Sequence, residues 1–243
     1  MTDLLRAELL KVRTTRTFFA LAGAAAGLTL LLAVLIAAID GAATRDDARD
    51  LLVLNTTAFF VLMLGAIGIT GEWRHRTITS SLLAAPDRRR FLLAKVLAYA
   101  AAGALLAAAI TLAAAVVAAA ILSSGDHATF TAGDALEATW RNAAAATLLG
   151  GFGVAAGSVL RNQVGTIVTL LVMAFMVEPA VLALSPDVGA VLPVTNAPAG
   201  ITFDFAGEGE ESLLPAAAGA AVELAWIAGL AALGALLLRR RDL

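Results

Sequence analysis

Six stretches of this chain are apolar over the length that an α-helix needs to cross a lipid bilayer. A hydrocarbon core about 30 Å thick requires roughly 20 helical residues. Windows of that size, with at most one charged residue each, lie at residues 17–39, 51–69, 96–122, 142–160, 164–184 and 213–238. A backbone in lipid must satisfy its own hydrogen bonds, and the Ala, Leu and Val runs do not alternate, so these windows predict helices rather than a β-barrel. We therefore expect an all-α polytopic membrane protein, with residues 1–243 forming one transmembrane domain.

The composition agrees with a membrane protein and excludes several kinds of site. Of the 243 residues, 60% are hydrophobic and 15% are charged, whereas a soluble domain is about half apolar and about a quarter charged. Because the chain has no cysteine, it has no disulfide, Cys-ligated zinc or thiol nucleophile. The two histidines, His75 and His127, are distant in sequence and form no ligand motif, so no metal site is expected.

Lysine and arginine determine the expected topology. With the N-terminus in the cytoplasm, the cytoplasmic segments hold 14 of the 17 basic residues, and the outer segments hold only Arg45, Arg49 and Arg141. The same outer segments hold 12 of the 19 acidic residues. The positive-inside rule therefore predicts six spans with both termini in the cytoplasm. The Ala- and Arg-rich, Lys-poor composition favours a bacterial source, and hence the bacterial cell membrane.

The two longer outer segments differ in kind. Residues 123–139 are polar and contain Gly, which predicts an ordinary loop. Residues 185–212 contain Pro186, Pro193 and Pro198, together with an apolar patch at 188–194. This second segment forms either short helices at the outer leaflet or a disordered acidic loop, and the sequence leaves both alternatives open.

The residues before the first span have the pattern of a helix that lies in the membrane interface. Within "TDLLRAELLKVRTTRTFF", Leu5, Leu9 and Val12 fall on one helical stripe, while Arg6 and Arg13 fall on another. An apolar stripe beside basic residues favours an amphipathic helix in contact with lipid headgroups. The alternative is a basic anchor without a further role.

A polar segment between the second and third spans is too long for a simple turn. It reads "GITGEWRHRTITSSLLAAPDRRRFLLAK", from Gly68 to Lys95. Ile78 and Leu82 are one helical turn apart, which predicts a short helix over residues 77–85 that ends at Pro86. A small amphipathic helix presented to the cytoplasm is most simply a docking element for a soluble partner, with Ile78 and Leu82 entering a groove on that partner.

This segment resembles the signature of type-2 ABC exporter permeases. The resemblance covers the six-span topology, the N-terminal residues 6–19, the terminal "RRRDL" and the polar segment itself. Many members carry Gly where this chain has Arg76. The positions that match the coupling segment of the family are Gly71, Glu72, Thr77, Ile78, Thr79, Leu82, Leu83, Pro86, Arg88, Arg89 and Arg90, with Lys95 entering the next span.

The resemblance implies a permease without an ATPase of its own. Such permeases form dimers and bind separate ATP-binding cassette subunits, which hold ATP and Mg²⁺, while the coupling helix transmits ATP-driven closure to the spans. On that basis we expect no enzymatic activity, no cofactor and no nucleic-acid partner for this chain. The sequence agrees independently, because its only lysines, Lys11 and Lys95, do not follow Gly, so a phosphate-binding G-x-x-x-x-G-K-[ST] loop is absent.

Two other classes of function remain open at this stage. The first is a membrane sensor or scaffold whose cytoplasmic helix docks a soluble signalling partner. The second, a secondary transporter, is disfavoured because the chain has no evident inverted repeat and few charges within its spans. A neighbouring gene that encodes a P-loop ATPase would favour the exporter over both.

Two acidic residues and a glycine pair within the spans have alternative interpretations. Glu178, followed by Pro179, is a candidate for substrate binding or gating, or else a structural partner at a kink. Glu223 is a candidate counter-charge for a cationic substrate, or else a hydrogen-bond partner between helices. Gly153 and Gly157, four residues apart, predict close helix packing.

The charge asymmetry generates a direct test of topology. Because the chain lacks cysteine, single cysteines at Arg89 and Glu210 are unique labels. An impermeant maleimide on intact cells should label the Glu210→Cys variant and leave the Arg89→Cys variant unlabelled until the cells are opened. Equal labelling of both variants in intact cells would contradict the topology.

Overall fold

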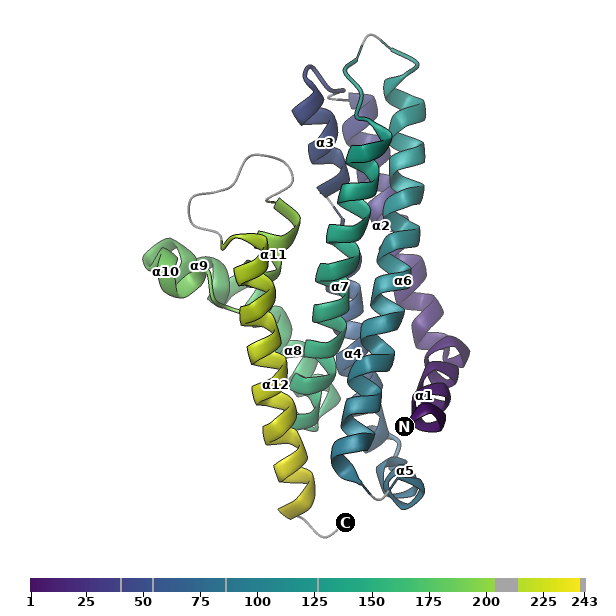
Figure 1. Ribbon diagram of the computed structural model, residues 1–243, viewed down its shortest axis with the longest axis vertical. Helices are drawn as coiled ribbons and strands as arrows, with labels where there is room; N and C mark the ends of the chain where they lie inside the picture. The colour runs from purple at the N-terminus through teal and green to yellow at the C-terminus, as the bar shows by residue number, and fades with distance from the viewer. Residues whose placement is uncertain (40, 54, 86, 126, 204–213, 241–243) are drawn as a thin grey trace.

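The computed structural model describes residues 1–39, 41–53, 55–85, 87–125, 127–203 and 214–240, and these residues form an elongated helical bundle (Figure 1). The N-terminus, α5 and the C-terminal end of α12 lie at one end of the bundle, and α3 and the start of α7 lie at the other. Pro86, the acidic stretch 204–213 that includes Glu210, and Arg241 lie outside the described residues.

Six helical segments of the described chain are long and apolar enough to cross a membrane, and no strand occurs among the described residues. This confirms the expected helical class and the number of candidate spans. The segments are α2 (Arg16–Ile39), α3 (Arg45–Val53) with α4 (Thr57–Arg74), α6 (Arg88–Leu122), α7 (Ala132–Leu160), α8 (Gln163–Val172) with the π-helix η1 (Met173–Val177) and α9 (Glu178–Leu184), and α12 (Ala216–Arg240). The shorter helices are α1 (Thr2–Thr14), α5 (Ile78–Ala84), α10 (Pro186–Gly189) and α11 (Asn196–Phe203).

Two long helices begin well before their apolar windows. The helix α7 starts at Ala132, so the prediction of an ordinary loop over all of residues 123–139 is wrong. Thr131 and Asp134 form a capping box, in which each side chain accepts a hydrogen bond from the backbone N–H of the other residue. Similarly, Asp87 accepts from the N–H groups of Arg89 and Arg90 at the start of α6. Polar caps let both helices continue beyond the apolar window, which hydropathy alone does not indicate.

The second candidate span is interrupted between α3 and α4. Asn55 lies in the break, where its side-chain oxygen accepts from the N–H of Thr57 at 2.8 Å. Its amide also donates to Thr111 of α6 at 2.6 Å. The Asn55 side chain offers the backbone an alternative to helical hydrogen bonds. The helix is therefore interrupted where the apolar composition predicted one continuous helix.

The fifth candidate span contains a π-helical turn directly before the Glu178-Pro179 pair. Pro179 has no N–H and cannot donate to the carbonyl of residue 175 in the turn before it. The turn widens at Met173–Val177, and α9 and α10 then point away from the bundle at the left of Figure 1. Of the two alternatives for residues 185–212, the described part contains the short helices α10 and α11.

The centre of the bundle is the contact of α7 with α4 and α6, which are the most extensive helix pairs. Glycines make this contact close, as the spacing of Gly153 and Gly157 predicted. A Cβ on Gly153 would collide with the backbone oxygen of Leu62, and one on Gly103 would lie 2.6 Å from the oxygen of Ala146. Small residues therefore bring the backbones together, as is common where helices associate in lipid.

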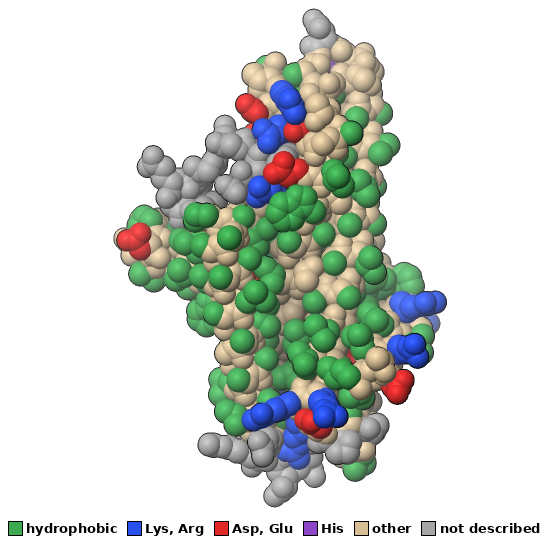
Figure 2. All heavy atoms as spheres, viewed as in Figure 1, with side chains coloured by type: hydrophobic (Ala, Val, Ile, Leu, Met, Phe, Trp, Pro, Cys, Tyr) green, Lys and Arg blue, Asp and Glu red, His purple; other side chains and the backbone are tan. Residues whose placement is uncertain are grey.

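The surface of the bundle differs between its middle and its ends in the kind of side chain it exposes. Figure 2 shows hydrophobic side chains over the middle of the visible face, with the charged side chains lying mainly toward the two ends. Among the exposed apolar side chains of the long helices are Leu105, Val116 and Phe175, each about 70% exposed (74%, 70% and 68%). Lipid is the solvent that accommodates such a surface, so the pattern supports a multi-pass membrane protein.

The close contact at Gly153 generates a stability test. Gly153→Ala places a methyl group against the backbone of α4, and overpacking of this kind is destabilising by about 1–3 kcal/mol. We expect a lower melting temperature of the purified protein in detergent. Gly23→Ala is the matched control, because a Cβ there meets nothing within 4 Å and Ala favours helix. Equal melting temperatures for the two variants would contradict a backbone contact at Gly153.

Candidate functional site

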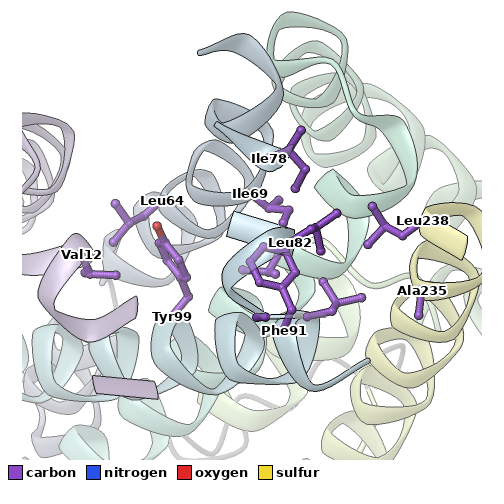
Figure 3. Packing of buried hydrophobic residues seen from close by; sticks show 12 residues of the cluster. Val12, Leu64, Ile69, Ile78, Leu82, Phe91, Tyr99, Ala235 and Leu238 are labelled. Carbon is purple, nitrogen blue, oxygen red and sulfur yellow. The ribbon is translucent and has the colours of Figure 1, made fainter. Parts of the chain in front are cut away.

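The short helix α5 lies at the end of the bundle, between α4 and α6 (Figure 1). Ile78 and Leu82 are 5% and 8% exposed. They belong to one buried apolar cluster with Phe91 and Leu92 of α6, Ile69 of α4 and Leu238 of α12 (Figure 3). The inner face of α5 is therefore part of the core of the chain rather than a free surface.

This packing bears on the predicted roles of Ile78 and Leu82. Both were expected to enter a groove on a partner, because they share a face of a short polar-flanked helix. That face is instead covered by α6 and by the end of α12, which return to the same place from later in the sequence. Both side chains are therefore buried within the chain itself, and their contact with a partner stays a prediction.

The outer face of α5 carries other residues of the matched segment. Leu83 is 79% exposed, and Thr79 and Ser80 are exposed beside it. Thr77, at the N-terminal end of α5, is also exposed and makes no side-chain cap to the helix. The end of the bundle that carries α5 also has exposed basic residues, among them Arg74, Arg76, Arg89 and Arg90. On the outer face of α5, Leu83 is thus an exposed apolar side chain beside the hydroxyl groups of Thr79 and Ser80.

Arg76 lies in the turn from α4 into α5. Arg76 has φ +58°, in the left-handed region that favours glycine. The N–H of Thr77 donates to the carbonyl of Glu72 at 2.8 Å, and the N–H of Arg76 to that of Trp73 at 3.2 Å. This is a Schellman-type helix end. Glycine would adopt this conformation without strain, whereas Arg76 adopts it with a Cβ.

The start of α6 is tied to the last helix. Arg88 is half-buried and donates a hydrogen bond to the carbonyl of Leu238 near the end of α12. Arg90 forms an ion pair with the capping residue Asp87 at 3.1 Å. The three arginines predicted to line a partner site therefore differ, since Arg88 faces its own chain and Arg89 and Arg90 are exposed.

Four charged side chains from three helices meet near α5. Lys95 of α6, which is 1% exposed, contacts Glu8 of α1 at 2.6 Å and Glu72 of α4 at 2.7 Å. Lys11 of α1 contacts the same two carboxylates at 2.7 and 3.2 Å. This ionic cluster, Glu8, Lys11, Glu72 and Lys95, is balanced, with two positive and two negative groups. Glu72 and Lys95 were matched residues of the segment, but Glu8 and Lys11 were not predicted to join them.

The electrostatics of the ionic cluster keep Glu8 charged. Burial alone would raise the pKa of Glu8, but the ammonium groups of Lys95 and Lys11 outweigh it and hold that pKa below its usual value. Removing one member of such a group leaves an uncompensated buried charge, which is strongly destabilising. The ionic cluster therefore fixes α1 against α4 and α6.

Glu178 is completely buried and its carboxylate is fully engaged. Its oxygens accept from the backbone N–H groups of Val194 and Thr195, both at 2.7 Å, and from that of Asn196 at 3.2 Å. The Thr195 hydroxyl donates to it at 2.6 Å. These groups form the N-terminal end of α11, where backbone amides lack helical partners and favour a negative charge. The geometry supports the structural alternative for Glu178.

Glu223 is also completely buried, but both of its carboxylate oxygens lack a hydrogen-bond partner among the described residues. The predicted hydrogen bond between helices is therefore not formed in the part of the chain that the structure describes. A buried polar group without a partner is unfavourable, so Glu223 is less well stabilised by its surroundings than Glu178.

Gly71, which is also a matched residue, lies in the final turn of α4 with open space where a side chain would be.

Comparison of the chain with known proteins found no matching protein-family model and no matching curated protein.

The contrast between the two buried glutamates generates a matched test. Glu178→Gln keeps the size of the side chain. It replaces a carboxylate that accepts several hydrogen bonds from backbone N–H groups with a neutral amide, so we expect a loss of about 1–3 kcal/mol in stability. Glu223→Gln removes an unpartnered buried carboxylate and should leave stability unchanged or raise it. Thermal unfolding of both variants in detergent makes the comparison. Destabilisation by Glu223→Gln alone would overturn this assignment.

Proposed function

We propose that this chain is the membrane-spanning permease subunit of an ATP-binding cassette exporter, in which α5 couples to a separate ATPase subunit. The observation that carries the proposal is the two-sided character of α5. Its inner residues pack in the core, whereas Leu83, Thr79 and Ser80 on its outer face are exposed. A helix of this kind offers a partner a surface that is firmly connected to the bundle.

The packing of α5 supports a mechanical role. The apolar cluster around Ile78 and Leu82 includes residues of α1, α4, α6, α7 and α12. Close-packed interiors have low compressibility and transmit displacement rather than absorb it. A partner that moves α5 would therefore act on several helices of the bundle at once, which is what coupling requires.

The chemistry of the outer face favours a protein partner with an apolar pocket and an acidic rim. Leu83 is a side chain that a pocket could cover, and Arg76, Arg89 and Arg90 are exposed nearby in the chain. Complementary charge contributes to orientation and association rate. ATP and Mg²⁺ would be bound by that partner, since the sequence contains no phosphate-binding loop.

The remaining parts of the proposal follow from the same picture. A dimer of this chain would provide a translocation path, the long apolar helices would contact membrane lipids, and the end with α5 would face the cytoplasm of a bacterial cell, in accordance with the positive-inside rule. The competing proposal, a membrane sensor or scaffold, uses the same exposed face of α5. The two differ in whether the partner hydrolyses ATP.

The test uses Leu83 and a matched control at the opposite end of the bundle. Burial of a Leu side chain at an interface contributes about 1.5–3 kcal/mol, so Leu83→Asp should weaken the complex with the ATPase at least about tenfold. Leu136→Asp is the control, because Leu136 is also exposed (65%, against 79% for Leu83) but lies near the start of α7. The measurement is co-purification from membranes of cells that express the chain with a candidate ATP-binding cassette ATPase, chosen from the genes that neighbour its own.

The readouts separate the alternatives. We expect ATP hydrolysis only in the complex, loss of the complex with Leu83→Asp, and an intact complex with Leu136→Asp. Both variants should reach the membrane in normal amounts, because neither side chain is buried. ATP hydrolysis by the chain alone, or full retention of the ATPase by Leu83→Asp, would refute the proposal. A partner that binds through α5 without ATPase activity would favour the scaffold.

A further inference from the structure

A groove of about 660 Å³ lies between α6 and α12. Exposed apolar side chains line it from both helices, among them Leu93 of α6 and Leu224 of α12. Its floor lies against α7, because a Cβ on Gly151 of that helix would be 3.3 Å from Val96 and 3.6 Å from Ile227, and both of these line the groove. None of the roles assigned so far requires this space.

The groove has the length of one membrane leaflet. At the end that carries α5, Leu238 of α12 belongs to the same buried cluster as Phe91 of α6, so the two helices meet there (Figure 3). Over its length, α12 packs more extensively on α7 than on α6. The lining residues of α12 run from Leu224 to Leu236, which is a rise of about 18 Å along a helix. This is comparable to half of a hydrocarbon core that is about 30 Å thick.

The lining of the groove carries one charge, at the end near α5. Apart from Arg89, its lining residues are Leu, Val, Ile and Ala. Arg89 is exposed in the first turn of α6, and its guanidinium forms no ion pair or hydrogen bond with another described residue. Asp87, at the start of the same helix, pairs instead with Arg90 at 3.1 Å. The groove therefore combines an apolar channel with an available cation.

We propose that this groove binds an anionic phospholipid of the leaflet on the α5 side. Its phosphate accepts hydrogen bonds from the guanidinium of Arg89, and one acyl chain lies along the apolar lining between α6 and α12. The planar guanidinium matches two oxygens of a phosphate and keeps its charge at neutral pH. This binding does not depend on the proposed coupling to an ATPase, because every contact comes from the chain and the bilayer.

The charge at this end of the bundle favours a lipid over a second copy of the chain. Small residues four apart, such as Ala228 and Ala232, also accept a neighbouring helix. However, a second copy in the same orientation brings its own basic end to the level of Arg89, including the exposed Arg74 and Arg76. Like charges oppose such an approach, whereas an anionic headgroup is attracted by them.

The proposal distinguishes phosphatidylglycerol from phosphatidylcholine with the same acyl chains. Both lipids have a phosphate, but the quaternary ammonium of phosphatidylcholine offsets the negative charge that Arg89 attracts. One basic residue near the membrane surface accounts for about a fivefold change in affinity for an anionic lipid. We therefore expect phosphatidylglycerol to bind about fivefold more tightly.

Two pairs of variants test the two parts of the groove. Arg89→Gln removes the cation, and Arg90→Gln is its control, because Arg90 is also exposed and carries the same charge but does not line the groove. Ala228→Trp fills the apolar part, and Ala113→Trp is its control, because Ala113 is also exposed but lies toward the other end of α6. Lipid binding to the delipidated, detergent-purified chain without an ATPase is measured by native mass spectrometry and thermal shift.

We expect the preference for phosphatidylglycerol in the parent, Arg90→Gln and Ala113→Trp, and equal binding of the two lipids by Arg89→Gln. Ala228→Trp should bind phosphatidylglycerol at least about tenfold more weakly than the parent, because the acyl chain loses its contacts. These results do not depend on whether an ATPase co-purifies with the chain, so the proposed coupling is tested separately.

Four outcomes would overturn the proposal. Equal binding of the two lipids by the parent, or an equal loss of preference in Arg89→Gln and Arg90→Gln, would show only a general attraction to a basic surface. Unchanged binding by Ala228→Trp would place the lipid outside the groove. Displacement of phosphatidylglycerol by an equal concentration of inorganic phosphate would exclude a role for the acyl chain. A parent that is dimeric in detergent and becomes monomeric with Ala228→Trp would identify a second copy as the occupant.

Discussion

The ammonium group of Lys95 holds together the end of the bundle on which α5 depends. It is almost completely buried and bridges Glu8 of α1 and Glu72 of α4, so three helices meet at one charge. A buried cation is tolerated only with close anionic partners, and the arrangement is therefore sensitive to any displacement of those helices. The apolar cluster around Ile78 and Leu82 includes side chains of the same three helices, α1, α4 and α6, so both clusters join these helices at this end of the bundle.

The same rule separates the two glutamates within the candidate spans. Glu178 is deep in the structure, yet it is matched by the backbone amides at the start of α11, and it therefore joins the kinked fifth span to the segment that follows. Glu223 has no such match among the described residues. An acidic residue in an apolar helix is thus not in itself a sign of substrate binding, because the surrounding backbone determines whether any capacity for interaction remains.

The sequence predicts well the features that depend on local composition. The six apolar segments, the short helix after the second of them and the close packing at Gly153 all follow from residue type and spacing. It does not predict which side of α5 faces inward, since that depends on Leu238, about 160 residues further along the chain, returning to the same place. One of the two partners of Lys95, Glu8, is 87 residues away in sequence, and no spacing rule could identify it. The signal that the sequence did contain was the scarcity of lysine, since the chain has only Lys11 and Lys95 and both belong to the ionic cluster.

That scarcity has a consequence for chemical labelling. With Lys95 enclosed in the ionic cluster and Lys11 half-exposed, an amine-reactive reagent finds one accessible side chain in the folded protein, besides the terminal amino group. Lys11 also lies on the wall of a cavity between α1, α4, α5 and α6. A fluorophore or cross-linker attached there by a reaction that keeps the amine cationic would report on the position of α1 without an engineered residue, and delayed modification of Lys95 would report on the opening of the bundle at this end.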